Sequence, residues 1–294
     1  MRSSRKRPLY RRKRSRKRSR KQRGGQSFEP LLSGAAFKSE CKYNLDDRYE
    51  IIPYDANLAE GDKVFLKFPD VRTKFLKSPP AKKVTLVIHN SDETFDDDTL
   101  ELVKPYASEV YAVNCSAKGA KQIPLGFRDD QYASHKVLHD VLKDASKSSE
   151  KSVLCLVNFN LGTNGGERAV ARDNFKGKSW VSKSENYMNL NTSKSLEHSD
   201  PEIQKMRVEY YTELKRTKFV ICPPGTGKDT HRVYETLFFG AIPVIKTSFL
   251  DPLYERLGGC WIVKDWGEVT EEACNERWKN VNRPKMDFGV KRWL

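Results

Sequence analysis

The residues whose types and spacing best suit chemistry lie between positions 221 and 232, which read ICPPGTGKDTHR. Glycines with a lysine and an arginine in one short turn are typical of phosphate binding, because backbone N–H groups and cationic side chains both attract anions. The phosphate loop of ATPases requires Gly, four residues, Gly-Lys and then Ser or Thr. Here Cys222 stands at the first glycine position and Asp229 at the hydroxyl position. The turn therefore predicts a phosphate site of a different kind.

The flanking residues place this turn between a strand and a helix. The apolar run 218–222 predicts a buried strand, and 229–239 predicts a helix that begins at Asp229 or Thr230 and ends before Gly240. A glycine-rich turn that leads into a helix N-terminus binds anions, and doubly wound sheets bind ligands at this edge. We therefore expect a ligand site at the carboxyl end of this strand.

Two charged residues follow the glycines on one face of the expected helix. Arg232 is placed to contact phosphate oxygens with its planar guanidinium, and Glu235, three residues later, suits the hydroxyls of a ribose. The alternative is a simple surface ion pair between Arg232 and Glu235, which is the commoner role of such a spacing.

Apolar runs and helical patterns alternate along the chain from about residue 60, which predicts parallel sheets covered by helices. The expected strands are 63–68, 84–89, 109–113 and 152–159 in a first series, and 218–222, 241–245 and 260–263 in a second. The expected helices are 95–104, 130–145, 200–215, 229–239 and two that begin near 248 and 270. Segment 183–200 is polar and predicts a loop or a short helix. Two series predict an α/β protein with two Rossmann-like halves and a hinge within 150–180.

The net charge of +15 comes almost wholly from one end of the chain. Residues 1–23 contain fourteen Lys and Arg and no acidic residue, whereas the remainder has 40 basic and 39 acidic residues. Such a tail repels itself and predicts disorder. Its charge fits attachment to nucleic acid, docking on an anionic membrane, nuclear targeting, or a solvated extension without a partner.

The scattered cysteines and the lack of a long apolar run argue against a disulfide-rich, zinc-binding, membrane-spanning or secreted protein. The six cysteines form no CxxC pair and the five histidines have no metal-ligand spacing, so we expect reduced thiols and no structural zinc. No run is long enough to span a membrane, and the first residues do not form a signal peptide. These features predict a soluble, cytoplasmic protein.

The block 218–245, KFVICPPGTGKDTHRVYETLFFGAIPVI, closely resembles the signature of exostosin-like (family 47) glycosyltransferases. Upstream, 84–92, 110–127 and 157–168 look like further elements of that family, as does 262–272 downstream, so that the resemblance covers roughly 84–272. It implies a GT-B-like fold in which two Rossmann-like domains with parallel sheets face a cleft. With it we expect a basic tail at 1–26, an acceptor-side domain at 27–160 and a nucleotide-sugar domain at 161–294.

The resemblance also implies an activity, namely transfer of a sugar from a nucleotide sugar to a hydroxyl of a glycan or glycoprotein. Inversion at the sugar, a UDP-sugar donor and no bound metal or other cofactor are expected from it. Relatives in animals and plants are usually membrane-anchored, and the absence of an anchor here points to an enzyme of the kind encoded by bacteria or large DNA viruses.

Carried over position by position, the resemblance gives roles to particular residues. Gly225, Thr226 and Gly227 would approach the sugar diphosphate with their backbone, and Arg232 would neutralise the leaving diphosphate in place of a metal ion. Glu235 would bind the ribose. Two further residues are expected to contact phosphate, Arg168 from the hinge side and Lys228, for which exposure to solvent is the alternative.

An inverting transferase needs one general base, and the end of the expected strand 84–89 offers two. Asp92 and His89 are the candidates, and the sequence does not choose between them. As alternatives, His89 is a hydrogen-bonded residue of the strand end and Asp92 belongs to a turn or cap. The triplet 96–98 matches the DxD pattern of Mn²⁺-dependent transferases, but it more simply caps the helix that follows.

Two other classes compete with this interpretation. A basic, nucleic-acid-associated NTPase would explain the tail and the PPGTGK string, but the turn departs from the ATPase pattern and no convincing second acidic motif follows an apolar strand. A non-catalytic protein that binds nucleotide sugars is the other alternative.

Overall fold

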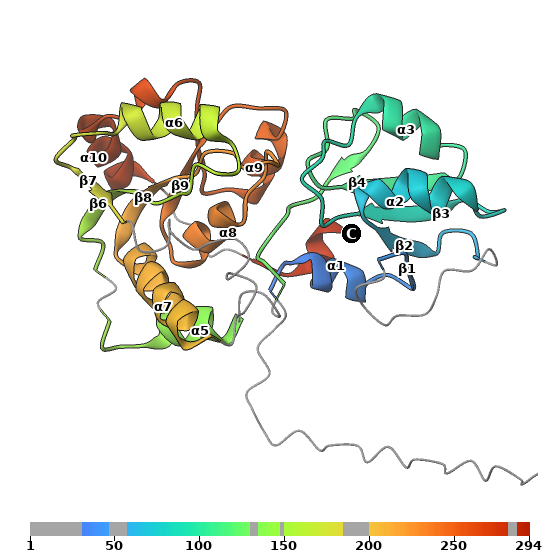
Figure 1. Ribbon diagram of the computed structural model, residues 1–294, viewed down its shortest axis with the longest axis horizontal. Helices are drawn as coiled ribbons and strands as arrows, with labels where there is room; N and C mark the ends of the chain where they lie inside the picture. Colours follow the sequence, from blue (N-terminus) through green and yellow to red (C-terminus); the bar gives the residue numbers. More distant parts are fainter. Residues whose placement is uncertain (1–30, 47–57, 130–134, 148–149, 185–199, 282–286) are drawn as a thin grey trace, which may run out of the picture.

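The computed structural model describes residues 31–46, 58–129, 135–147, 150–184, 200–281 and 287–294. Within them the chain forms two five-stranded sheets, each with helices packed around it, and every strand pair is parallel (Figure 1). This is the two-domain, Rossmann-like α/β architecture predicted from the alternating pattern. The basic tail and most of segment 183–200 lie outside the described residues.

The first sheet has the strand order β1-β2-β3-β4-β5. Its central strand is buried at all five positions of VTLVI, as expected for a parallel strand covered on both faces. The strands are β1 (Tyr43–Asn44), β2 (Lys63–Leu66), β3 (Val84–Ile88), β4 (Ala107–Ala112) and β5 (Lys121–Gln122). The α-helices in the described part of this half are α1 (Gly34–Ser39), α2 (Phe68–Thr73) and α3 (Asp97–Val103).

The acidic triplet 96–98 forms the start of α3. Asp96 is the N-cap, and its carboxylate accepts hydrogen bonds from the backbone N–H of Thr99 at 2.9 Å and from the Thr99 hydroxyl at 2.6 Å. Asp97 and Asp98 occupy the first turn, where negative charge stabilises a helix. The interpretation as a helix cap is therefore confirmed.

The second sheet has the order β10-β9-β8-β6-β7. Its strands are β6 (Val153–Val157), β7 (Val181–Lys183), β8 (Thr217–Ile221), β9 (Ile242–Lys246) and β10 (Trp261–Val263). The helices of this half are α5 (His135–Lys143), α6 (Gly165–Asn174), α7 (Pro201–Lys215), α8 (His231–Phe238), α9 (Asp251–Leu257) and α10 (Glu271–Asn280). The strand expected at 152–159 was placed in the first series, and that placement is wrong, because β6 pairs with β7 and β8.

One apolar cluster contains residues of both halves, and the end of the chain returns to the first half. Leu32 donates its backbone N–H to the Phe288 carbonyl at 2.8 Å, and the Tyr111 hydroxyl donates to the Leu294 carbonyl at 3.4 Å. Figure 1 accordingly places the C-terminus beside α1 and β2 rather than with the second sheet. Contacts far apart in the sequence therefore hold the two sheets together.

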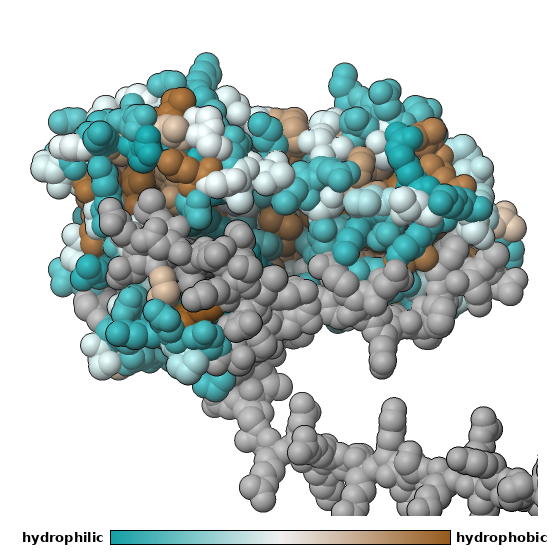
Figure 2. All heavy atoms as spheres, in the orientation of Figure 1, coloured by the Kyte–Doolittle hydropathy of each residue, from teal (hydrophilic) through white to brown (hydrophobic). Residues whose placement is uncertain are grey.

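Hydrophilic residues cover most of the described surface on the face drawn in Figure 2. In the part of the chain that the structure describes, no helix combines the length and the apolar character needed to cross a membrane.

Candidate functional site

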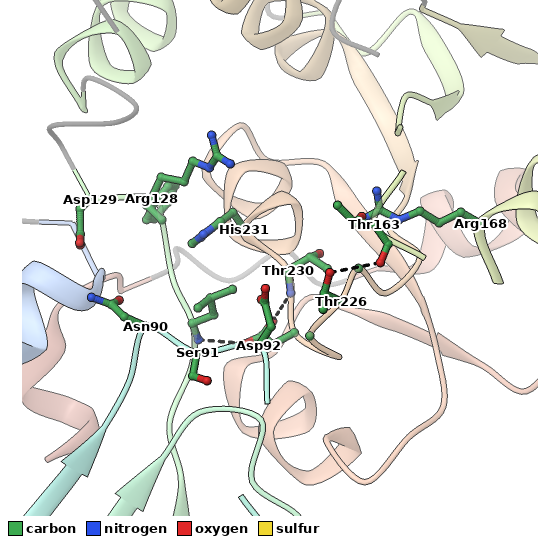
Figure 3. Close-up of a pocket in the computed structure, with 15 residues that line it drawn as sticks. Asn90, Ser91, Asp92, Arg128, Asp129, Thr163, Arg168, Thr226, Thr230 and His231 are labelled. Carbon is green, nitrogen blue, oxygen red and sulfur yellow. Dashed lines mark hydrogen bonds between the residues drawn. The ribbon is translucent and has the colours of Figure 1, made fainter. Parts of the chain in front are cut away.

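A cavity of about 580 Å³ opens between the two halves and is lined from both. This volume falls in the range of small-molecule sites. The first half contributes Asn90, Ser91 and Asp92, which follow β3, and the segment after β5 (Figure 3). The second half contributes Arg168 on α6 and the turn after β8. The predicted site thus lies at the carboxyl ends of strands in both sheets.

The glycine turn closes on itself and leaves its backbone facing the cavity. The Gly225 N–H donates to the Gly227 carbonyl at 3.0 Å, and the Thr226 hydroxyl donates to the Thr163 carbonyl at 3.2 Å. A Cβ on Gly227 would lie 2.9 Å from Asn114 Nδ2 and 3.1 Å from Asp92 Oδ1. Glycine is therefore required here, because the turn passes directly against the first half of the chain.

Arg168 is held in place by backbone carbonyl groups. Its Nε donates to the Pro224 carbonyl at 2.9 Å and its Nη1 to the Asn160 carbonyl at 2.5 Å. Burial, and then the nearby positive charge of Arg232, lower the pKa of Arg168 to about 10, so the guanidinium is still charged at neutral pH. An oriented cation with only neutral partners among the described residues is suited to bind an anion.

Of the two residues predicted as the general base, Asp92 lines the cavity and is exposed to it. His89 is fully buried beneath the described lining, with its ring 4.9 Å from that of Phe37. Because a carbonyl only accepts, the contact of 3.1 Å to the Pro124 carbonyl places the proton on His89 Nε2. His89 Nδ1 then accepts from the Asn90 N–H at 2.8 Å, so both ring nitrogens are engaged within the protein.

His89 also fixes the side chain of Asn90. Asn90 has a left-handed backbone, with φ of 55°, and its amide lies where a side chain on Gly34 would be. The amide lies 2.9 Å from His89 Nδ1, which carries a lone pair in this tautomer. The amide nitrogen therefore belongs at this position, and this orientation gives a partner to an otherwise unsatisfied Nδ2. Burial lowers the pKa of His89, which keeps the ring neutral.

Arg232 and Glu235 lie on α8, outside the described lining of the cavity. Arg232 Nη1 donates to the Tyr210 hydroxyl at 3.1 Å. Glu235 accepts from the hydroxyls of Tyr210 at 3.2 Å and Tyr211 at 3.4 Å, and burial raises its pKa. Lys228 is exposed and lines a separate cavity of about 190 Å³ on the other side of the turn.

Asp229 joins the two halves through its buried carboxylate. Its Oδ2 accepts the backbone N–H of Leu125 at 2.8 Å, and its own N–H donates to Asn114 Oδ1 at 2.8 Å. Tyr234 and Tyr254 donate to it at 2.5 and 3.0 Å. Helix α8 starts at His231 with Thr230 at the N-cap position, so the Asp229 carboxylate serves the interface between the halves.

Among the lining residues to which the sequence analysis assigned no role are Arg128, Asp129, Thr163 and His231. Arg128 and Asp129 directly follow the IPLGF element at 123–127, so a charged pair after that element was the available signal. Asp129 accepts the Ala35 N–H at 2.6 Å, and His231 donates from Nδ1 to the Gly126 carbonyl at 2.7 Å. Burial and then Arg128 lower the pKa of His231 to about 4, so His231 is neutral at pH 7.

Across the described ranges, no group of three or more His, Cys, Asp or Glu side chains is arranged to hold a metal ion.

Comparison with known families adds one match to this geometry. Residues 167–261 match the family model of the RXYLT1 C-terminal domain. That family is related to xylosyltransferases, so this part of the chain is similar to a domain of glycosyltransferases. The matched stretch covers about a third of the chain and runs from α6 to β10, including Arg168 and the glycine turn. No curated protein matches the chain.

Proposed function

We propose that the protein is a glycosyltransferase that moves a sugar from a nucleotide sugar, with a UDP-sugar as the first candidate, to a hydroxyl of a glycan or glycoprotein. The observation that carries the proposal is the juxtaposition of the glycine turn and Arg168 with Asp92 across one cavity, with the turn and Arg168 inside the glycosyltransferase-like stretch. The exostosin-like resemblance supports inversion and a reaction without a metal ion.

In this proposal the second half holds the donor. The backbone of Gly225–Gly227 and the guanidinium of Arg168 bind the diphosphate, and the charge of Arg232 adds to the positive potential behind them. Glu235 is the proposed ribose ligand, for which it would share its carboxylate with the hydroxyls of Tyr210 and Tyr211.

Asp92 acts as the general base from the first half. Its carboxylate takes the proton of the acceptor hydroxyl while the hydroxyl oxygen forms a bond to the anomeric carbon of the donor. The bond between that carbon and the diphosphate oxygen breaks at the same time, and the nucleoside diphosphate leaves with both electrons. Arg168 stabilises the charge that develops on the leaving oxygens.

A screen of nucleotide sugars with the full chain tests the proposal, with thermal shift reporting binding and release of nucleoside diphosphate reporting turnover, both without added metal. The variant Asp92→Asn keeps the shape but cannot take a proton. We expect it to lower the rate by about 10²–10⁴-fold and to leave donor binding within about twofold of the wild type. Donor binding without any turnover would favour the non-catalytic alternative, and Mg²⁺-dependent binding of ATP alone would favour the NTPase.

A further inference from the structure

Two guanidinium groups face the cavity, one from each half of the chain. Arg168 bonds to two backbone carbonyl groups, and the Arg128 side chain makes no hydrogen bond or ion pair with another described residue. Like charges that face one small cavity repel each other, and an anion between them removes that cost. Asp92 and Asp129 also line the cavity, so its positive charge is confined to the two guanidinium groups, which together suit a group that carries more than one negative charge.

Arg128 extends from a fixed part of the backbone. The N–H of the preceding residue, Phe127, donates to the Leu32 carbonyl at 2.7 Å, and its ring packs 5.2 Å from that of Phe288. The Arg128 carbonyl accepts from His135 Nε2 at 2.7 Å. These contacts fix the backbone of Arg128, so the Cα from which its half-buried side chain extends has a defined position.

The Arg128 side chain extends across to the second half. Burial raises the pKa of Glu235 and lowers that of His231, and the positive charge of Arg128 lowers the pKa of both residues, which lie on α8. Figure 3 shows Arg128 and Arg168 extending from opposite sides of the site, with His231 next to Arg128 in the view. His231 adds no competing positive charge near pH 7, since its ring is neutral there.

We infer that Arg128 binds the donor's diphosphate from the acceptor-side half, opposite the glycine turn and Arg168. This inference rests on the proposed function and adds to it a diphosphate ligand from the acceptor-side half. Two opposed guanidinium groups match two phosphate groups, so the donor is a nucleoside diphosphate sugar rather than a nucleoside monophosphate sugar. The leaving group then contacts both halves, and its binding stabilises their relative arrangement.

Isothermal titration of the full chain without metal tests this assignment, with UDP, UMP, GDP and GMP as probes. Of UDP and GDP, the one that the wild type binds more tightly should have an affinity about tenfold or more above that of its own monophosphate, as expected for charge-assisted hydrogen bonds. Arg128→Gln should abolish most of that preference and change monophosphate affinity by less than about threefold. Arg128→Lys keeps the charge but not the planar fork. Its preference for the diphosphate should fall between those of the wild type and Arg128→Gln.

Arg172→Gln is the matched control, because Arg172 lies on α6 with Arg168 but has a half-buried side chain that pairs with Asp173 at 2.9 Å and lies outside the described lining of the cavity. It should retain the wild-type preference. If the wild type binds a diphosphate and both Arg128 variants bind it equally well, the role of Arg128 is refuted while the proposed function stands. If the wild type binds neither UDP nor GDP, the proposed function fails and the inference fails with it.

Discussion

Replacing Asp229 by Asn tests whether burial or hydrogen bonding has the larger effect on the pKa of the carboxyl group that lies between the two halves. The side chain is 2% exposed and accepts hydrogen bonds from Leu125 N, Tyr234 Oη, Tyr254 Oη and Thr230 N at 2.8, 2.5, 3.0 and 2.8 Å. The loss of hydration on burial favours the protonated form, whereas the four donors favour the ionised form.

Burial is the larger effect and raises the pKa of Asp229 from 3.8 to about 6, against the hydrogen bonds led by that from Tyr234. A rise of this size corresponds to about 3 kcal/mol. Between about pH 4 and pH 6 the folded protein holds this proton and the unfolded chain does not, so the contribution of Asp229 to stability falls as the pH rises through this window. Above about pH 6 both states are ionised and the contribution is constant.

Urea unfolding of the wild type and Asp229→Asn at several values between about pH 4 and pH 7 measures this contribution, because the amide cannot ionise and the other groups cancel in the difference. The stability of the wild type relative to the variant should fall by about 3 kcal/mol across this range. A difference that rises with pH would refute the reasoning, because it would mean that the four hydrogen bonds outweigh burial and depress the pKa.

Two further predictions concern the turn. Gly227→Ala should destabilise the protein by about 1–3 kcal/mol in urea unfolding and weaken nucleotide binding, because the new Cβ would press on Asn114 and Asp92. The control Gly166→Ala has nothing within 4 Å of its Cβ and lies in α6, so it should be neutral or stabilising by up to about 1 kcal/mol; equal losses in both variants would contradict the steric argument. Lys228→Ala should change nucleotide affinity by less than about twofold in the same titration, since Lys228 lines the other cavity, and a much larger loss would place it at the phosphates.

The strands and helices were largely predictable because local patterns define them. The run VTLVI at 84–88 is buried throughout and forms β3, and Asp96 caps α3 as its spacing indicates. Strand order was not predictable, because it depends on pairing between distant residues. The run at 152–159 has the same apolar character as strands of the first sheet, and only its pairing with β8 places it in the second.

The sequence by itself determined that the glycine turn lies between a strand and a helix, which is the local setting on which the proposed phosphate binding rests. It also placed Asp92 directly after a strand, at the edge where parallel sheets bind ligands. Only the tertiary structure separated Asp92 from His89, because Phe37, some fifty positions earlier in the chain, packs on the buried histidine, whereas the aspartate lines the cavity. Asp92 is therefore the residue that we propose as the general base. Arg128 likewise gains its place opposite Arg168 only when the two sheets meet, because the separation of two side chains across a cleft is set by packing between domains and leaves no local pattern in the sequence.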